Sequence, residues 1–226
     1  METGALLVDF GGVLTSSVPS AFRAAGGRLF GRPALIEQLL HQVPEAADLL
    51  VAHESGRLGV AGFEAGFGEL LLGHGITADK AVGMVRAIQD RLRPDEMMLA
   101  AVRHVRGHGV PVALVSNAFG EDPYAGYDLP QLVDVAVVST ELGLRKPSRR
   151  IYQVACRRLG VEPGTAVLVD DLAMNLAGAA RLGIGGILHV ESSLTIAELR
   201  RRFCPPSCTG LVPGQEIASE RPDLPH

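Results

Sequence analysis

The sequence predicts an α/β fold, a doubly wound parallel sheet of the Rossmann-like type with an inserted helical cap. Five short apolar runs are continuous rather than alternating, which is typical of strands buried on both faces of a parallel sheet. Helical patterns separate these runs, and one long helical stretch separates the first run from the second. The predicted strands cover residues 5–8, 112–115, 135–138, 166–169 and 186–190.

The helices of the sheet domain are predicted from their start and stop signals. Pro94 opens one helix, which continues to Gly107. A second helix carries Ile151 on its apolar face and stops at Gly160. A third is predicted to begin at Asp171 and to end at Gly183, with Leu172, Leu176, Ala179 and Ala180 facing inward.

The stretch between the first two strands is too long for a loop in a compact domain. It contains LIEQLLHQV, ADLLVAHESG, FEAGFGELLL and KAVGMVRAIQDRL, in which apolar residues recur every three to four positions. We therefore expect residues 1–15 and 93–203 to form the core and residues 16–92 to form a helical cap. The remaining residues, 204–226, are rich in proline and are expected to form a mobile or loosely packed tail.

Composition excludes several classes of partner. The chain has 226 residues, with 21 basic and 25 acidic side chains and a formal net charge of −4, so its overall charge does not attract it to nucleic acid or to an anionic membrane, although this leaves room for a local anion site. No basic segment precedes the first apolar run, and no apolar stretch approaches the roughly 18 residues of a spanning helix. We expect a cytoplasmic monomer or homodimer. The odd number of cysteines, Cys156, Cys204 and Cys208, predicts neither a disulfide framework nor a zinc site.

Polar side chains follow the predicted strands. In an open parallel sheet, ligands bind beyond the carboxyl ends of the strands, so side chains at these ends are expected to meet. A carboxylate, a hydroxyl, a lysine and a carboxylate pair together suit a metal ion and an anion. They are Asp9 after the first strand, Ser116 and Asn117 after the second, Lys146 after the third, and Asp170 and Asp171 after the fourth.

Physical roles follow from residue types. Carboxylates together with phosphate oxygens suit Mg²⁺, and an aspartate such as Asp9 can also form a covalent phosphoryl intermediate. Ser116 and Lys146 would hold phosphoryl oxygens, and Gly12 lets backbone N–H groups approach the phosphate. Each residue alone is more often a cap, a turn former or a solvated charge. Their convergence at one sheet edge favours the functional interpretation.

Four motifs, LLVDFGGVL, VALVSNA, ELGLRKPSRRIY and VLVDDLAMNLAGA, occur in this order. Together they resemble the haloacid dehalogenase-like hydrolases, in the branch with a helical cap after the first strand. The resemblance covers about residues 4–192, and VAHESGRLGVAGFEAGF is similar to the cap turn of that family. The resemblance implies that Asp9 is the nucleophile and a Mg²⁺ ligand, and that Gly11 gives a backbone carbonyl ligand. It implies that Ser116 and Lys146 hold the phosphate, and that Asp171 is a direct metal ligand supported by Asp170, or the reverse. Asn117 and Asn175 would be orienting residues.

Gly11 departs from the family pattern, which has a second aspartate two residues after the nucleophile. That aspartate protonates the leaving oxygen, and general acid help is worth about 10² to 10⁴ in rate. The first alternative is a phosphohydrolase for a small phosphorylated metabolite with an easier leaving group, such as a sugar 1-phosphate or acyl phosphate, or one that takes an acid from the cap.

Other functions stay open on the sequence alone. Halide departure needs no proton, so a 2-haloacid dehalogenase is a second alternative, although the pair Asp170 and Asp171 would then lack a purpose. A third is a non-catalytic member of the fold that binds a phosphorylated ligand or a protein. A nicotinamide dehydrogenase is disfavoured because no G-x-G-x-x-G follows the first strand. Two cap histidines, His53 and His74, are expected to be structural and partly exposed.

Overall fold

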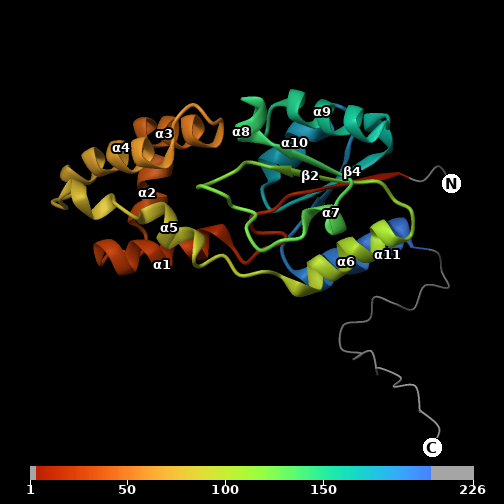
Figure 1. Ribbon diagram of the computed structural model, residues 1–226, viewed down its shortest axis with the longest axis horizontal. Coiled ribbons are helices and arrows are strands. Elements are labelled where there is room, and N and C mark those ends of the chain that lie inside the picture. Colours follow the sequence, from red (N-terminus) through yellow and green to blue (C-terminus); the bar gives the residue numbers. More distant parts are fainter. Residues whose placement is uncertain (1–3, 205–226) are drawn as a thin grey trace, which may run out of the picture.

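The computed structural model describes residues 4–204 and places a five-stranded sheet beside a group of helices (Figure 1). All strand pairs are parallel, in the order β3-β2-β1-β4-β5, which confirms the predicted fold class. The central position of β1 puts the residue that follows it in the middle of the carboxyl edge. The strands are β1 (Ala5–Val8), β2 (Val112–Ser116), β3 (Val135–Val138), β4 (Ala166–Asp170) and β5 (Gly185–Leu188).

Successive side chains of β1 pack into two different hydrophobic cores because strand side chains alternate between the faces of a sheet. Leu6 and Val8 pack into the cluster under α6 (Glu96–Gly107) and α11 (Ser192–Phe203). The opposite face carries Ala5 and Leu7, packed against the helices on that side (Figure 1). These are α8 (Ser139–Leu142), α9 (Arg149–Leu159) and α10 (Ala173–Ala180), while α7 (Leu129–Leu132) and η2 (Pro163–Thr165) are short connections.

The helices inserted between β1 and β2 have a core of their own, centred on Phe63, Phe67 and Leu71. The chain leaves and re-enters the sheet domain at one point, where Thr15 and Pro94 form an isolated bridge and the N–H of Ser16 donates to Arg93 O at 2.7 Å. We call α1 to α5 the inserted helices. They are α1 (Val18–Phe30), α2 (Leu35–Gln42), α3 (Pro44–Glu54), α4 (Val60–Leu72), η1 (Ala78–Ala81) and α5 (Met84–Gln89).

Several boundaries differ from the sequence prediction. Pro94 lies before α6, which begins at Glu96 with the Asp95 side chain capping Met98 N. The third core helix begins at Ala173 rather than Asp171, so Leu172 lies in the preceding loop and is 48% exposed. Gly83, with φ 78°, separates η1 from α5 within one expected helix. Ala180 is exposed rather than inward, β5 ends at Leu188 rather than 190, and helices α1 and α11 were not anticipated.

Among residues 4–204, no helix combines the length and apolarity needed to cross a membrane. The proline-rich tail, including Cys208, lies outside the described residues. The packing expected for that tail therefore stays a prediction.

Candidate functional site at the carboxyl edge of the sheet

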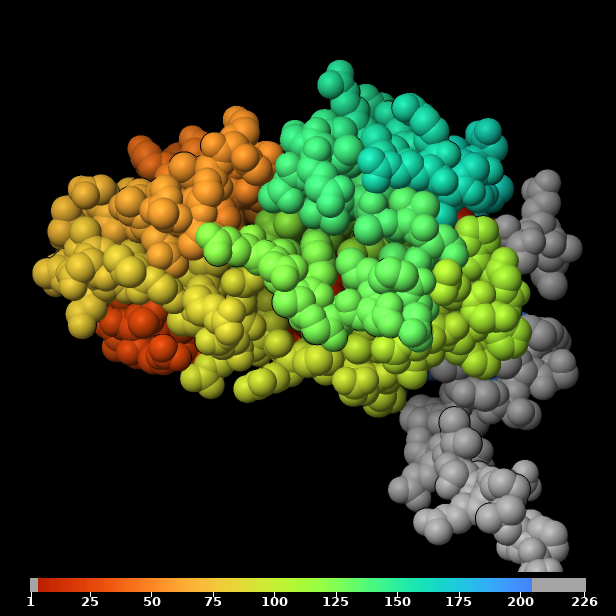
Figure 2. All heavy atoms as spheres, viewed as in Figure 1, coloured from red at the N-terminus to blue at the C-terminus, as the bar shows by residue number. Residues whose placement is uncertain are grey.

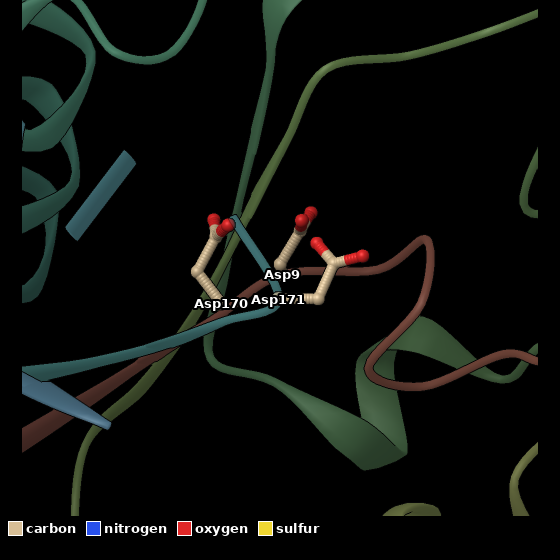
Figure 3. Close-up of side chains that lie close together, drawn as sticks. All are labelled: Asp9, Asp170 and Asp171. Atoms are coloured by element: carbon tan, nitrogen blue, oxygen red, sulfur yellow. The ribbon is translucent and has the colours of Figure 1, made fainter. Parts of the chain in front are cut away.

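Three neighbouring strands deliver the predicted site residues to one place. Asp9 directly follows β1, Ser116 is the last residue of β2, and Asp170 is the last residue of β4. Since β1 pairs in parallel with both neighbours, these ends lie at the same edge. Figure 3 shows the carboxylates of Asp9, Asp170 and Asp171 close together at this edge.

Lys146 ties the first and fourth strands together. Its Nζ lies 2.6 Å from Asp9 Oδ1 and 2.7 Å from Asp170 Oδ2, and its side chain is only 1% exposed. Asn117 holds the lysine backbone from both sides, because the N–H of Lys146 donates to Asn117 Oδ1 at 2.8 Å and Asn117 Nδ2 donates to Lys146 O at 3.2 Å. Asn117 therefore orients Lys146 through the main chain.

Asp170 is held on both carboxylate oxygens. Oδ2 accepts a hydrogen bond from Lys146 Nζ, while Oδ1 accepts hydrogen bonds from Asn175 Nδ2 and from the N–H of Leu172, both at 2.9 Å. Tyr152 in turn donates to Asn175 O at 2.9 Å. Asp170 is fully buried and serves to fix its neighbours, whereas Asp171 faces the adjoining cavity.

A glycine on α10 allows this close arrangement. A Cβ at Gly178 would collide with the carbonyl oxygen of Pro147, the residue after Lys146. The absence of a side chain at Gly178 therefore lets α10 approach the lysine loop.

Burial and crowding shift the acids of this cluster upward. Burial is the largest cause and raises the pKa of Asp9 to about 7, against the opposing effect of Lys146. Burial, followed by Asp170, raises the pKa of Asp171 to about 6. Burial lowers the pKa of Lys146, but Asp9 and Asp170 raise it by more, so the lysine stays charged.

The donor set fits a hard divalent cation. One oxygen from each of Asp9, Asp170 and Asp171 lies within 4.8 Å of the others. Hard oxygen ligands are those that Mg²⁺ prefers. When all three carboxylates are ionised, the single ammonium group leaves two negative charges unbalanced, and a divalent cation would neutralise them.

Of the two glycines predicted at the site in the loop after β1, Gly11 lines the cavity and Gly12 does not. A Cβ on Gly11 would lie 3.0 Å from Val18 Cγ2. Gly12 has φ 79°, and a Cβ there would clash with the Asp171 carboxylate. Its N–H donates to Thr15 Oγ1 at 3.1 Å and so holds the loop.

A cavity of about 900 Å³ opens over this cluster, between the sheet edge and the inserted helices. It contacts Asp9, Ser116, Asn117, Lys146 and Asp171 at one end. Figure 2 shows a hollow between the yellow and green surfaces, with red N-terminal atoms visible inside it. This volume is within the range of sites for small molecules, about 300–1,000 Å³.

Sequence reasoning missed the residues that join the inserted helices to the sheet domain. Glu54, at the end of α3, binds Arg145 Nη2 at 2.6 Å, and burial raises the pKa of Glu54. Ser139 Oγ donates to Glu54 O at 2.5 Å. The available signal was E-S-G at residues 54–56, which marks a tight turn but not its partner.

His53 is buried rather than partly exposed. It stacks on Phe63 and meets Phe119 edge-on, with ring centroids 5.1 and 5.3 Å apart. Its Nε2 accepts the N–H of Gly120 at 2.9 Å, so the other ring nitrogen carries the proton that contacts Leu58 O. His74 is exposed.

The fold and this edge site define a class, the Rossmann-like α/β proteins with a carboxylate and lysine site beyond the strand ends. Within that class, the chain belongs to the haloacid dehalogenase-like hydrolases, whose family model matches residues 3–183.

Relatives in the family include both phosphatases and dehalogenases. The chain is 26% identical over 130 residues to the sesquiterpene phosphatase astK of Aspergillus oryzae, covering 56% of this chain and 66% of that protein. It is 30% identical over 112 residues to (S)-2-haloacid dehalogenase 4A of Burkholderia cepacia, covering 45% and 48%. The chain thus spans about half to two thirds of these relatives.

Solved structures share the fold. A haloacid dehalogenase family enzyme of Bacteroides thetaiotaomicron, in complex with magnesium and inorganic phosphate, superposes with a TM-score of 0.58 at 21% identity. The match covers 83% of this chain and 94% of that chain.

The cluster predicts a large stability cost when its lysine is removed. In Lys146→Met, Asp9 and Asp170 lose the cation that both contact, and breaking a buried ion pair costs about 3–5 kcal/mol. Urea unfolding without divalent cations should show this loss in the free energy of unfolding. The control is Lys80→Met, at the only other lysine of the sequence, which is exposed. Equal losses in the two variants would contradict the assignment of Lys146 as the structural centre of the cluster.

Proposed function

We propose that the protein is a magnesium-dependent phosphohydrolase that acts on a small phosphorylated substrate through a phosphoryl group carried on Asp9. The observation that carries the proposal is that Asp9, Lys146 and Ser116 line one cavity, with Asp9 in direct contact with Lys146. An aspartate, a hydroxyl and a buried ammonium group at one point can attack and hold a phosphoryl group. The phosphatase relative supports this choice.

Asp9 is oriented for attack by its own partners. Oδ1 is held by Lys146 and by the N–H of Phe10, at 2.6 Å each, which leaves Oδ2 to act as the nucleophile. Oδ2 bonds to phosphorus while the bond from phosphorus to the leaving oxygen breaks, and that oxygen takes a proton from water. A second water then bonds to phosphorus, the bond to Asp9 breaks, and a proton passes to solvent.

Asp9 and Asp171, with the backbone carbonyl of Gly11, would hold Mg²⁺ at the mouth of the cluster, and Asp170 would support them. When bound, the ion offsets charge on the phosphoryl oxygens. Ser116 and Lys146 would hold the remaining oxygens, and the inserted helices would act as a cap that keeps bulk water out.

Gly11 restricts the leaving group. It has no side chain to protonate the leaving oxygen, and Val18 occupies the space beside it. The leaving oxygen must therefore depart with little proton transfer, which favours esters of acidic alcohols and phenols over simple alkyl esters.

A 2-haloacid dehalogenase is the second candidate, favoured by the 30% identity to such an enzyme. Its substrate carboxylate needs a cation in the cavity. Without a metal ion, Lys146 must balance Asp9 and Asp170 and has no charge to spare for a substrate carboxylate, and Arg145 is paired with Glu54. The unbalanced negative charge of the cluster also opposes an anionic substrate in the absence of a metal ion.

Removing the nucleophile tests the proposal. Asp9→Asn should lower magnesium-dependent release of phosphate from 4-nitrophenyl phosphate by at least about 10⁴-fold, as expected when a nucleophile is lost. Asp48→Asn, an exposed substitution on α3, is the matched control. Unchanged turnover in Asp9→Asn would contradict the nucleophile assignment, and no turnover of any phosphate ester by the native chain would favour a binding role.

Metal binding is testable without turnover. Mg²⁺ at about 100 times its Kd should stabilise the native chain by about 2.7 kcal/mol, visible as a rise in Tm. Asp171→Asn should lose most of this rise because it removes a carboxylate ligand. Asp122→Asn is the control, since Asp122 lines the cavity away from the cluster. An equal rise in Asp171→Asn would place the ion elsewhere.

Restoring the missing acid should widen the range of substrates. Gly11→Asp combined with Val18→Ala, which makes room for the new side chain, should raise kcat on alkyl phosphates by about 10²-fold. Turnover of 4-nitrophenyl phosphate, whose leaving group needs no proton, should change little. Steady-state rates on both esters decide the point, and an unimproved alkyl rate in the folded double variant would mean that another group supplies the proton.

A further inference from the structure

We propose that the organic half of the substrate is apolar, so that the protein takes phosphate monoesters of hydrophobic phenols or hydrophobic acidic alcohols. This inference rests on the proposed function, and it concerns the end of the cavity away from Asp9. That end is formed by the inserted helices and by the loop that follows β2.

Apolar side chains make most of this distant wall. Phe119 stands three residues after Ser116, so the wall changes from polar to aromatic within one short loop. Phe119 meets Phe22 of α1 at 6.1 Å between ring centroids, which joins the two parts of the molecule across the cavity. The other apolar lining residues of the inserted helices are Val18, Pro19, Leu40, Leu50, Val60, Val85 and Ile88.

Two carboxylates that the inserted helices contribute to this wall already have protein partners. Both oxygens of Glu64 accept backbone N–H groups, from Val85 and Gly83 at 2.9 Å each. Glu37 pairs with Arg23 at 2.9 Å. These acids are used to hold the helices, which reduces what the wall can offer to sugar hydroxyls.

Two further polar side chains of the inserted helices and their end are engaged in the same way. Arg86 pairs with Asp90 at 2.8 Å, and Gln89 Nε2 donates to Phe119 O at 3.2 Å. A substrate rich in hydroxyl groups would lose hydrogen bonds to water here without regaining them, which is costly. An apolar group loses nothing and gains from burial.

Charge disfavours a second anionic group on the substrate. The arginine that the inserted helices contribute to the lining, Arg86, is paired with Asp90, and Arg145 of the sheet domain is paired with Glu54. A bisphosphate or a phosphorylated acid would have to take one of these cations from its carboxylate. The wall therefore accepts one phosphate at the Asp9 end and a neutral group beyond it.

The rim of the cavity adds a second apolar feature. Leu172 and Met174 flank the start of α10 directly after Asp171, and they are 48% and 60% exposed. They add exposed apolar side chains to the lining on the sheet-domain side of the cavity.

Binding tests this inference independently of turnover. Isothermal titration calorimetry with n-alkylphosphonates from methyl to octyl, in the presence of Mg²⁺, should show Kd falling by about fourfold for each added methylene that is buried. Affinity that stays flat or weakens along the series would overturn the inference.

Hydrolysis separates this inference from the proposed function. Phenyl phosphate and its 4-methyl, 4-butyl and 4-octyl derivatives have nearly equal leaving groups, so kcat/KM should rise with chain length through binding alone. Glucose 6-phosphate, with its many hydroxyls, should be a poor substrate. Turnover of phenyl phosphate with no rise in kcat/KM along the series would overturn the apolar site and leave the proposed phosphohydrolase activity standing. Alkylphosphonates that bind more tightly with length, together with no turnover of the aryl phosphates, would overturn only the proposed hydrolase activity.

Two leucines of the inserted helices provide a matched pair of variants. Leu40 and Leu70 are both half-buried against the same core, but only Leu40 lines the cavity. Leu40→Gln should reduce the gain from the octyl chain by about tenfold or more, while Leu70→Gln should leave it unchanged. Val60→Thr, which keeps the side-chain shape, is the second variant should Leu40→Gln fail to fold. An equal gain in the native chain and in the lining variants would contradict the placement of the chain against this wall.

Discussion

The buried contact of Lys146 with Asp9 and Asp170 is the constraint on which the rest of the site depends. A lysine so far from water is stable only with carboxylates beside it, and these carboxylates are crowded enough to need a positive charge. The strand order makes this possible, because β1 and β4 are neighbours and end at the same edge. Asn117 and Gly178 then serve one purpose, which is to bring the backbone of Lys146 close to the ends of these strands.

The same constraint links the site to the inserted helices. Arg145 precedes Lys146 and pairs with Glu54, so the loop that supplies the lysine also holds the end of α3. His53 and Ser139 add two further hydrogen bonds across this junction. The cavity is therefore closed on one side by groups that also position the charged cluster, which couples the shape of the cavity to the position of Asp9.

The sequence predicted the sheet well because a parallel strand buried on both faces leaves a continuous apolar run, as at residues 5–8. Polar residues at strand ends could be assembled into a site because parallel strands must end at one edge. Contacts between distant segments left no local signal. Glu54 and Arg145 are 91 residues apart, and neither has a pattern that indicates the other. Leu172 was wrongly predicted to lie inside the helix, because the apolar periodicity of α10 includes it. Its backbone N–H instead donates to the Asp170 carboxylate, which fixes this residue in the loop before the helix.

The apolar far wall and the missing acid at Gly11 point to the same chemistry, in which a hydrophobic group leaves without much proton transfer. The proposed phosphohydrolase function depends on covalent transfer of the phosphoryl group to Asp9. The most direct measurement is a single turnover quenched in acid, followed by mass spectrometry of the peptide that contains residues 5–14. The account predicts a phosphoryl group on Asp9 that is released by hydroxylamine, whereas phosphate release with an unmodified Asp9 at every quench time would contradict it.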